Sequence, residues 1–517
     1  MSTVKRKILF ISPAKTIPVN EEGELVYKPR ANVSLPALTV LGVLEQRGWE
    51  TSFIDAAAEG YRDLSLLGGH LVRFGLSDEA VAERAVSLKP SLILATSMFT
   101  FEEQVVKSLC KVLKERLPKT PIIVGGIHAT TRPDWILEDQ SIDCVVLGEV
   151  ENVIEDILLG LLGESNEASW QQHIAYKQGA YLKIGLPARL TGSPDFPWAF
   201  RTVLIGPDGK LRYTDDTMCR SNIYGHRLQQ QGRTGSFSLY GSRGCPTGCE
   251  YCASTSLFGP KIRHMGSERM FKDFIALRRQ LGIHVFYNQA DTFGYHKEDI
   301  QFLRLVADYR SNSSDFGFVL NNPNAFFLRL FFPTRLKGEF DWEFVDLLAR
   351  AGINVITLAI ETFTQRFNRK IDWSRIKLEK VVELLRYLRE KDIKSEIYLI
   401  YAFPGQTYEE LVHDLTCAGQ IAAYADKVCW KNLVIFPGTE YYNWALREQR
   451  FTEDEYRQEV QKGYSFHRLT DFFNFSKIPT SELKAIFKKW SPAFHPGLPA
   501  ARTLSRKEPR GVDFYSS

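Results

Sequence analysis

Short apolar runs alternate with amphipathic segments through the first 163 residues of the chain. The apolar runs predict strands at residues 7–12, 50–55, 90–96, 120–125 and 143–147. Between them, apolar residues recur at helical spacing and predict helices at residues 35–47, 77–88, 102–117 and 152–162. This alternation favours a doubly wound parallel sheet, in which ligands bind at the carboxyl ends of the strands. We therefore expect residues 1–165 to form a Rossmann-like α/β domain.

The alternation resumes at residue 236, after a stretch of mixed composition that we interpret as a linker (residues 166–235, with strand-like pieces at 180–184, 202–205 and 211–213). Beyond it, the pattern predicts strands at residues 236–240, 284–288, 317–320, 354–360, 394–402 and 428–436. Helices are predicted at residues 267–281, 297–309, 342–351, 379–391 and 407–422. Six β/α units favour a partial, TIM-like (β/α)6 barrel over residues 236–450. Residues 451–517 are expected to form a small helical extension, with helices at 453–462 and 480–490.

The composition narrows the class of protein. A hydrophobic fraction of 44% in 517 residues is ample for full-sized cores. The net charge of +4 implies no polyanionic partner, so we expect no nucleic acid. No run reaches the roughly 18 apolar residues of a transmembrane helix, and the apolar stretch at the N-terminus is too short for a signal peptide. Most of the scattered cysteines lie in apolar runs, which is typical of reduced core residues, and we predict a soluble cytoplasmic protein.

Three cysteines lie close together directly after the first strand of the predicted barrel. Cys245, Cys249 and Cys252 have C-x3-C-x2-C spacing in a glycine-containing loop. Three thiolates in such a loop can bind an iron–sulfur cluster and leave one iron without a protein ligand. A disulfide is disfavoured by the odd local count. A structural zinc ion would need a fourth ligand, and the nearest candidates in the sequence are Cys219, His226 and His264.

The cysteine loop resembles that of the radical S-adenosylmethionine (SAM) enzymes. The resemblance implies that Cys245, Cys249 and Cys252 are the catalytic ligands of a [4Fe–4S] cluster whose free iron binds SAM. In that family an electron from the cluster cleaves SAM and releases a 5′-deoxyadenosyl radical. Tyr251, the aromatic residue before the third cysteine, is expected beside the adenine. Because no second cluster motif is visible, a flavodoxin or ferredoxin is the expected electron donor.

Later strand ends resemble the same family. The motif N-Q-A-D-T-F resembles D-D-x-F, with the first acid replaced, and contains Asp291. The motif A-I-E-T resembles I-E-S-G and contains Glu361, which would hydrogen-bond the ribose or amine of SAM. The motif A-F-P-G-Q-T resembles G-F-P-G-E-T, a turn near the adenine, and contains Gly405. The resemblance therefore adds Asp291, Glu361 and Gly405 to the predicted cofactor-binding residues.

Loops in the N-terminal third resemble a second feature, the cobalamin-binding domain of cobalamin-dependent radical SAM enzymes. In that family, GG-x-H-x-T and GE-x-E loops line the corrin ring and its nucleotide tail. The resemblance implies cobalamin contacts for six residues of this chain: Gly125, Gly126, His128, Thr130, Gly148 and Glu149. For His128, a purely structural role as a loop residue stays open.

The loop after the first strand departs from many cobalamin proteins. Those proteins supply a histidine to cobalt through D-x-H-x-x-G, and this motif occurs nowhere in the chain. Residues 13–18, which follow the first strand, contain no histidine. We therefore expect cobalamin without a histidine lower ligand.

Together, the two resemblances imply a cobalamin-dependent radical SAM enzyme of class B, most simply a C-methyltransferase. Its substrate would be a small molecule, with a natural product or a lipid as candidates. One alternative is an oxidative cyclase or rearrangement enzyme that transfers no methyl group. Another is a non-catalytic cobalamin-binding sensor with a vestigial barrel. A phenylalanine-rich segment at residues 321–341 is interpreted as a covering loop, with an apolar substrate wall as its functional alternative.

Overall fold

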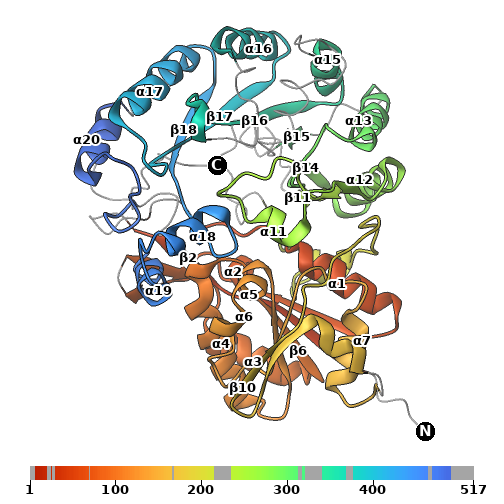
Figure 1. Ribbon diagram of the computed structural model, residues 1–517. Coiled ribbons are helices and arrows are strands. Elements are labelled where there is room, and N and C mark those ends of the chain that lie inside the picture. Colours follow the sequence, from red (N-terminus) through yellow and green to blue (C-terminus); the bar gives the residue numbers. More distant parts are fainter. Residues whose placement is uncertain are drawn as a thin grey trace. The chain divides into compact units, whose positions relative to one another are not determined.

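The computed structural model describes residues 6–19, 25, 29–68, 70–165, 168–214, 235–311, 317–320, 341–367, 377–463 and 469–490 (Figure 1). The chain folds into two compact units, and each is described by itself. Unit 1 comprises residues 1–220, 253–259 and 436–463, and unit 2 comprises residues 221–252, 260–435 and 464–517. Apart from Asp341, the phenylalanine-rich segment lies outside the described residues.

Unit 1 is built on a seven-stranded sheet with the order β10-β9-β8-β7-β6-β1-β3. Five parallel strands correspond to the predicted ones: β1 (Lys7–Ser12), β3 (Glu50–Asp55), β6 (Leu92–Thr96), β7 (Ile122–Gly125) and β8 (Cys144–Val146). The other two, β9 (Ile174–Gln178) and β10 (Tyr181–Ile184), pair antiparallel at the β8 edge. Part of the segment predicted to be a linker is therefore a strand pair of this sheet.

Two of the main helices of unit 1, α1 and α3, begin at a serine that caps the helix. The hydroxyl of Ser34 accepts the Ala37 N–H at 3.3 Å, and that of Ser77 accepts the Ala80 N–H at 3.1 Å. The four predicted helices are α1 (Leu35–Gln46), α3 (Asp78–Leu88), α4 (Glu103–Arg116) and α7 (Ile154–Leu161). Further helices are α2 (Ala56–Glu59), α5 (Ile127–Thr131), α6 (Pro133–Ile136), α8 (Phe200–Leu204), α11 (Ser254–Phe258), α18 (Glu440–Arg447) and α19 (Glu453–Gln461).

Two local features of unit 1 differ from the sequence pattern. Residues 202–205 were expected to be strand-like, but α8 covers most of them, and the adjacent Val203 and Leu204 are both buried. A short apolar run does not distinguish a strand from a buried helical turn. The second feature is a three-stranded ribbon in the order β2 (Lys15–Pro18), β5 (Leu71–Phe74) and β4 (Leu64–Gly68), which places the segment after β1 in a strand.

Unit 2 contains a sheet of six parallel strands that pair in chain order. They are β11 (Gly235–Leu239), β14 (Ile283–Asn288), β15 (Gly317–Leu320), β16 (Ile353–Glu361), β17 (Lys394–Tyr401) and β18 (Lys427–Asn432). In the described strands β11 and β18 form the two edges, so the barrel is partial. β18 ends at Asn432, short of the predicted end at residue 436, because its partner β17 ends at Tyr401.

Five helices lie along the outside of this curved sheet (Figure 1). They are α12 (Ser267–Leu281), α13 (Lys297–Arg310), α15 (Trp342–Arg350), α16 (Leu378–Glu390) and α17 (Tyr408–Ala422). A two-stranded ribbon, β12 (Ser242–Arg243) with β13 (Arg263–His264), flanks the cysteine loop. The arrangement leaves the other face of the sheet as the inner face of the partial barrel.

The predicted C-terminal extension contributes to both units. Its first helix, α19, belongs to unit 1. Its last helix, α20 (Thr480–Trp490), belongs to unit 2, where the ring of Phe487 packs on Tyr401 at 4.1 Å and on Trp430 at 5.3 Å between centroids. None of the helices in the described part of the chain combines the length and apolar composition needed to cross a membrane.

Candidate functional site

The three cysteines of unit 2 lie on a tight loop that follows β11. Cys245 and Cys249 are buried and Cys252 is half-buried. The Thr247 hydroxyl lies between two of the thiols, 2.9 Å from Cys245 Sγ, and accepts a bond from Cys249 Sγ at 3.5 Å. The loop turns through Gly248, whose φ of 61° is left-handed and suits glycine. The loop thus gathers the thiols in a mostly dry environment.

Asp291 fixes the start of the cysteine loop. Its Oδ2 accepts the backbone N–H of Gly244 at 2.9 Å. The next residue, Thr292, donates from its hydroxyl to Gly244 O at 3.3 Å and accepts the Ser242 hydroxyl on its carbonyl at 2.8 Å. The carboxyl end of β14 is therefore tied to the cysteine loop. The structure places this predicted cofactor-binding residue against the loop backbone, where it orients the cysteines.

Burial favours the protonated form of two of the three thiols. Burial raises the pKa of the Cys249 thiol to about 12 and also raises the pKa of Cys245. Iron binding must therefore displace protons from these thiols. Within the described ranges, no three His, Cys, Asp or Glu side chains converge as a site for one metal ion. Three thiolates on one loop suit an iron–sulfur cluster, in which each thiolate binds a different iron.

Glu361 ends β16 and lies close to the cysteine loop. Its carboxyl is buried, and burial raises its pKa to about 8. A charge on Glu361, when it ionises, would raise the pKa of both Cys249 and Tyr251, so its carboxyl lies near these two side chains. The Tyr251 ring meets Phe403 edge-on at 6.4 Å, and Phe403 stacks on Phe367 at 4.7 Å. The carboxyl ends of β16 and β17 thus meet the cysteine loop in one place.

A residue that sequence reasoning missed, Asp414 of α17, holds the turn after Glu361. Its carboxylate accepts the Thr362 hydroxyl at 2.7 Å, the Phe363 N–H at 2.8 Å and the Thr364 hydroxyl at 3.3 Å. Glu361 itself has a φ of 64°, which is left-handed and strained for a residue other than glycine, so the turn must be held. Burial raises the pKa of Asp414 to about 6, although these hydrogen bonds oppose the rise.

One sequence signal could have identified Asp414. It lies on the apolar face of α17 beside Leu411, Leu415 and Ala418, all of which are buried. An acid on the buried face of a helix needs hydrogen-bond partners, and such groups gather at functional sites. The spacing of apolar residues in α17 predicts that Asp414 is buried. It does not predict which groups Asp414 binds, because the turn lies about 50 residues earlier in the chain.

Gly405 lies in the turn that follows β17. Its φ is 67°, and a Cβ added there would meet no atom within 4 Å. Its carbonyl accepts a bond from Arg366 at 2.7 Å, and its N–H donates to the Phe475 carbonyl at 2.7 Å. The turn is therefore fixed by its backbone on one side and open beside its Cα.

In unit 1, the loops after β6 and β7 approach each other closely. A Cβ added at Gly126, whose φ is 111°, would lie 2.5 Å from the Ser97 carbonyl oxygen. The Ser97 N–H donates to the Gly125 carbonyl at 2.7 Å. The Ser97 hydroxyl is buried and has no hydrogen-bond partner in the described part of the chain. An orphaned hydroxyl beside an obligatory glycine at the carboxyl edge of a parallel sheet suits a bound ligand.

The loop after β8 is held by the preceding loop and by residues of the predicted linker. The Gly148 N–H donates to the Thr130 hydroxyl at 3.0 Å. A Cβ added at Gly148 would lie 2.2 Å from the Ala188 carbonyl oxygen, which accepts the Glu149 N–H at 2.8 Å. The structure thus brings Thr130, Gly148 and Glu149 together. In this structure the glycine is required for close approach of the backbone at Ala188.

His128 points into the protein. It is 3% exposed. Its Nδ1 lies 3.2 Å from the Thr100 hydroxyl and its Nε2 lies 2.9 Å from Glu103 Oε2 in α4. Although burial raises the pKa of Glu103, its bonds and charge pairing with His128 and Lys107 hold that pKa at about 2. Both ring nitrogens are therefore engaged, and this geometry favours the structural role for the side chain.

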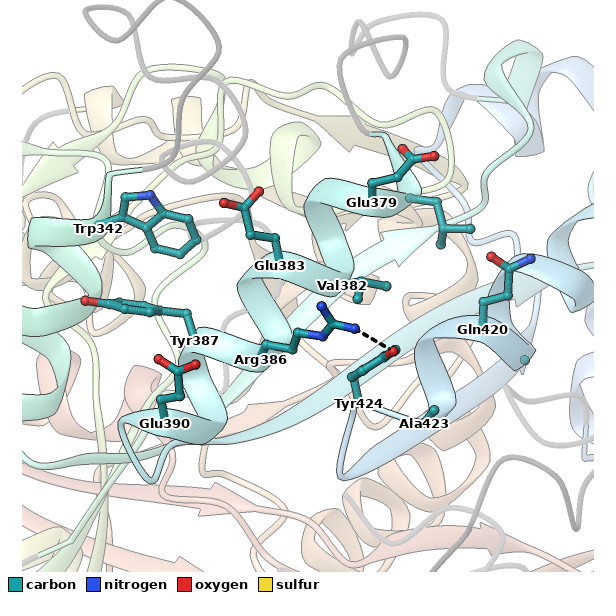
Figure 2. Close-up of a pocket in the computed structure, with 12 residues that line it drawn as sticks. Trp342, Glu379, Val382, Glu383, Arg386, Tyr387, Glu390, Gln420, Ala423 and Tyr424 are labelled. Atoms are coloured by element: carbon teal, nitrogen blue, oxygen red, sulfur yellow. Dashed lines mark hydrogen bonds between the residues drawn. The ribbon is translucent and has the colours of Figure 1, made fainter.

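The groove in Figure 2, of about 940 Å³, lies away from these residues on the outer surface of α16 and α17. The Arg386 guanidinium crosses it and donates to the Tyr424 hydroxyl at 2.8 Å. Trp342 and Tyr387 form an edge-to-face pair at one end, with centroids 4.6 Å apart. None of the predicted site residues lines this groove.

Two family matches divide the chain in the same order as the predicted domains. Residues 33–158 match the B12 binding domain, and residues 239–418 match the Radical SAM superfamily. The first match covers the loops that carry Ser97, Gly126 and Gly148, and the second covers the cysteine loop, Glu361 and Asp414.

Two relatives are similar to this chain over different shares of its length. A cytidylyl-2-hydroxyethylphosphonate methyltransferase of Streptomyces wedmorensis is 24% identical over 436 residues, which are 78% of this chain and 76% of the relative. An anaerobic magnesium-protoporphyrin IX monomethyl ester cyclase of Synechocystis sp. is 28% identical over 232 residues, which are 44% of this chain and 42% of the relative. The match to the methyltransferase is therefore the more extensive of the two.

A solved structure supports the fold over both units. The radical SAM methyltransferase TsrM from Kitasatospora setae, with cobalamin and a [4Fe–4S] cluster bound, aligns with a TM-score of 0.60 and 18% identity, over 86% of this chain and 75% of TsrM. The predicted fold class is confirmed: a doubly wound N-terminal sheet is followed by a partial barrel. With a B12 binding domain followed by a radical SAM domain, the chain belongs to the cobalamin-dependent radical SAM enzyme family.

Proposed function

We propose that the protein is a class B radical SAM C-methyltransferase that acts on an unactivated carbon of a small molecule, with natural products and lipids as candidate substrates. The proposal rests mainly on one observation: the side chains of Glu361 and Tyr251 lie near Cys249 of the cysteine loop. A site that cleaves SAM needs its SAM-binding groups beside the cysteine loop. A non-catalytic cobalamin-binding sensor would have no use for this arrangement.

The SAM-binding residues of the proposal are Glu361, Tyr251 and Gly405. The Glu361 carboxyl receives no hydrogen bond from the described residues, and its pKa of about 8 makes it a neutral acid at pH 7. It can therefore both donate to and accept from a ribose hydroxyl. The proposed adenine contacts are Tyr251, whose ring meets Phe403, and Gly405, where an added Cβ would meet no atom within 4 Å.

The cofactor-binding residues divide between the two units. Cys245, Cys249 and Cys252 would hold the cluster, and the loops of Ser97 and Gly126 would hold cobalamin. When bound, the cluster would supply the electron that cleaves SAM, and cobalamin would carry the methyl group. The chain's own contribution is to position SAM and substrate and to exclude water from them.

We propose further that no histidine binds the lower face of the corrin. The segment after β1, where many cobalamin proteins place that histidine, contains none, and much of it forms β2. Both ring nitrogens of His128 are engaged within unit 1. A flavodoxin or ferredoxin is the proposed electron donor, and the cytoplasm is the proposed location.

A second candidate function is oxidative cyclisation or rearrangement without methyl transfer. It is favoured by the similarity to a cyclase over 232 residues. Both functions use the same SAM-cleaving residues, so the described geometry does not separate them. Their products do, because methyl transfer converts one SAM to S-adenosylhomocysteine and a second to 5′-deoxyadenosine and methionine.

The deciding experiment uses protein reconstituted anaerobically with iron, sulfide and hydroxocobalamin. Reductant, SAM with a deuterated methyl group and cytidylyl-2-hydroxyethylphosphonate, the compound in the relative's name, are added, and products are followed by mass spectrometry. S-adenosylhomocysteine together with 5′-deoxyadenosine is expected, and a product that keeps the methyl deuterium would identify the substrate. 5′-Deoxyadenosine without S-adenosylhomocysteine would favour the cyclase. Formation of neither would contradict both functions.

A further inference from the structure

Thr247 lies in the middle of the cysteine loop, two residues after Cys245 and two residues before Cys249. Its hydroxyl oxygen is 2.9 Å from Cys245 Sγ and 3.5 Å from Cys249 Sγ. Within the described part of the chain, these two sulfur atoms are the hydrogen-bond partners of the hydroxyl. The residue is only 8% exposed, which limits the access of water. The hydroxyl therefore interacts with the thiols rather than with solvent.

The loop around Thr247 is held by its own backbone, so the hydroxyl has little freedom to move away from the sulfur atoms. Asp291 accepts the Gly244 N–H at the start of the loop, and the Cys252 N–H donates to the Cys249 carbonyl at 3.1 Å. The chain turns at Gly248, directly after Thr247. A residue between two ligands of such a short loop stays beside both of them when they bind metal.

Iron binding changes the direction of these hydrogen bonds. In the metal-free loop, the Cys249 thiol donates to the Thr247 oxygen. A cysteine bound to iron is a thiolate and has no proton to donate. The Thr247 hydroxyl is then the donor, and its single proton can bond to one sulfur at a time. The shorter of its two contacts is that with Cys245, which makes this sulfur the preferred acceptor.

We infer that the Thr247 hydroxyl donates a hydrogen bond to the Cys245 thiolate and thereby raises the reduction potential of the cluster. The inference rests on the proposed function, because it takes the three cysteines as ligands of a [4Fe–4S] cluster. Hydrogen bonds to the sulfur atoms are among the determinants of a cluster's potential.

The sign of the effect follows from the charge of the cluster. Reduction adds one electron and makes the sulfur ligands more negative, and a hydrogen bond to a more negative acceptor is stronger. The hydroxyl therefore stabilises the reduced cluster more than the oxidised one. Thr247 acts through Cys245, and it makes the cluster easier to reduce by the proposed flavodoxin or ferredoxin.

The test compares the midpoint potential of the cluster in the wild type and in variants of Thr247. Each protein is reconstituted anaerobically with iron, sulfide and hydroxocobalamin and is poised at stepwise lower potentials with redox mediators, without SAM. The electron paramagnetic resonance signal of the reduced cluster gives the midpoint. Thr247→Val removes the hydroxyl and keeps the shape of the side chain. At a fixed potential its ratio of reduced to oxidised cluster should be about tenfold lower, which corresponds to about 59 mV.

Three further variants separate the hydroxyl from other effects of the substitution. Thr247→Ser keeps the hydroxyl and should keep the wild-type potential. Thr247→Ala removes the hydroxyl without filling its place and should lower the potential as Thr247→Val does. Thr416→Val is the matched control, because this exposed threonine of α17 bonds to the Val412 carbonyl of its own helix. Iron and sulfide analysis measures cluster loading in every variant.

The inference is overturned if Thr247→Val and Thr247→Ala keep the wild-type potential. It is overturned equally if Thr247→Ser lowers the potential as far as they do, since the hydroxyl would then not be the cause. Loss of iron from both Thr247→Val and Thr247→Ala would assign the residue to assembly of the loop and would also overturn it. The proposed function fails separately: a wild type that forms neither 5′-deoxyadenosine nor S-adenosylhomocysteine would contradict it even if the potentials change as expected.

Discussion

The candidate residues of the two units use their polar groups in different ways. In unit 1, the ring of His128 and the hydroxyl of Thr130 are bonded to other parts of the same unit. In unit 2, the carboxyl of Glu361 is buried without a hydrogen bond from the described residues, and Gly405 has open space beside it. Apart from the Ser97 hydroxyl, unit 1 therefore offers an edge made mainly of backbone, whereas unit 2 offers polar side chains.

The difference suggests how each unit would recognise its cofactor. A large, rigid corrin can be held by shape, so the residues that matter are those that let loops approach, such as Gly126 and Gly148. A smaller cosubstrate such as SAM must be oriented by a few polar groups. Its binding should therefore depend on the residues whose side chains supply these groups. Substitutions in the two units should therefore have separable effects.

The largest expected effect is that of Cys249→Ala. Removal of one of three thiolates should abolish the visible absorption of the cluster and all formation of 5′-deoxyadenosine, while bound corrin stays near the wild-type amount. Cys417→Ala, which alters a buried cysteine of α17, is the control and should keep both. Loss of corrin along with the cluster would show that the two sites are not independent, and retained cleavage would refute the cluster assignment.

The next largest effect is expected for Gly126→Ala. The new Cβ would lie 2.5 Å from the Ser97 carbonyl oxygen at a φ of 111°, so the two loops must move apart. We expect hydroxocobalamin to bind at least about tenfold more weakly, which corresponds to about 1.4 kcal/mol, with iron content unchanged. Equilibrium dialysis measures the first and iron analysis the second.

Gly179→Ala provides the comparison for that variant. Gly179 also has a positive φ, of 61°, but no atom lies within 4 Å of its added Cβ. It should therefore carry a positive-φ strain, smaller than that at Gly126, without a steric clash, and it should leave corrin binding unchanged. Similar losses in both variants would mean that strain alone, rather than the loop contact at Ser97, lowers the affinity.

The smallest expected effect is that of Asp414→Asn. An asparagine keeps one acceptor for the turn at residues 362–364 but replaces the other by a donor, so Glu361 should be less well positioned. We expect SAM to bind about threefold to tenfold more weakly. Asp308→Asn, an exposed acid of α13, is the control. Unchanged SAM affinity in Asp414→Asn would remove Asp414 from the positioning of Glu361.

The same variant has a signature in the pH dependence of stability. Burial raises the pKa of Asp414 from 3.8 to about 6, so folding favours the protonated acid. Its contribution to stability is present below pH 4 and is lost as the pH rises through 6. The free energy of unfolding of the cofactor-free wild type, relative to Asp414→Asn, should fall over this interval by on the order of 2 kcal/mol. Urea unfolding at both ends of the interval measures it, and a constant difference would contradict the assigned burial.

The sequence by itself determined the elements and the order of the two domains. The five parallel strands of unit 1 and the six of unit 2 occur where the apolar runs predict them, because these runs are long enough to have one periodicity. The cysteine motif could be found for a similar reason, since its ligands lie within eight residues of one another. The pattern was insufficient at residues 202–205, where a four-residue run formed a helix instead of a strand.

Only the tertiary structure decided which distant residues meet. The bond from Asp414 to the turn after Glu361 and the contact of Ala188 with Gly148 join segments about 40 to 50 residues apart. Because β9 pairs with β8, part of the predicted linker belongs to the sheet of unit 1. His128, a predicted cobalamin contact, instead points into the protein and bonds to Thr100 and Glu103. Periodicity specifies whether a residue is buried, but its partner depends on how the whole chain packs, and no local pattern encodes that choice.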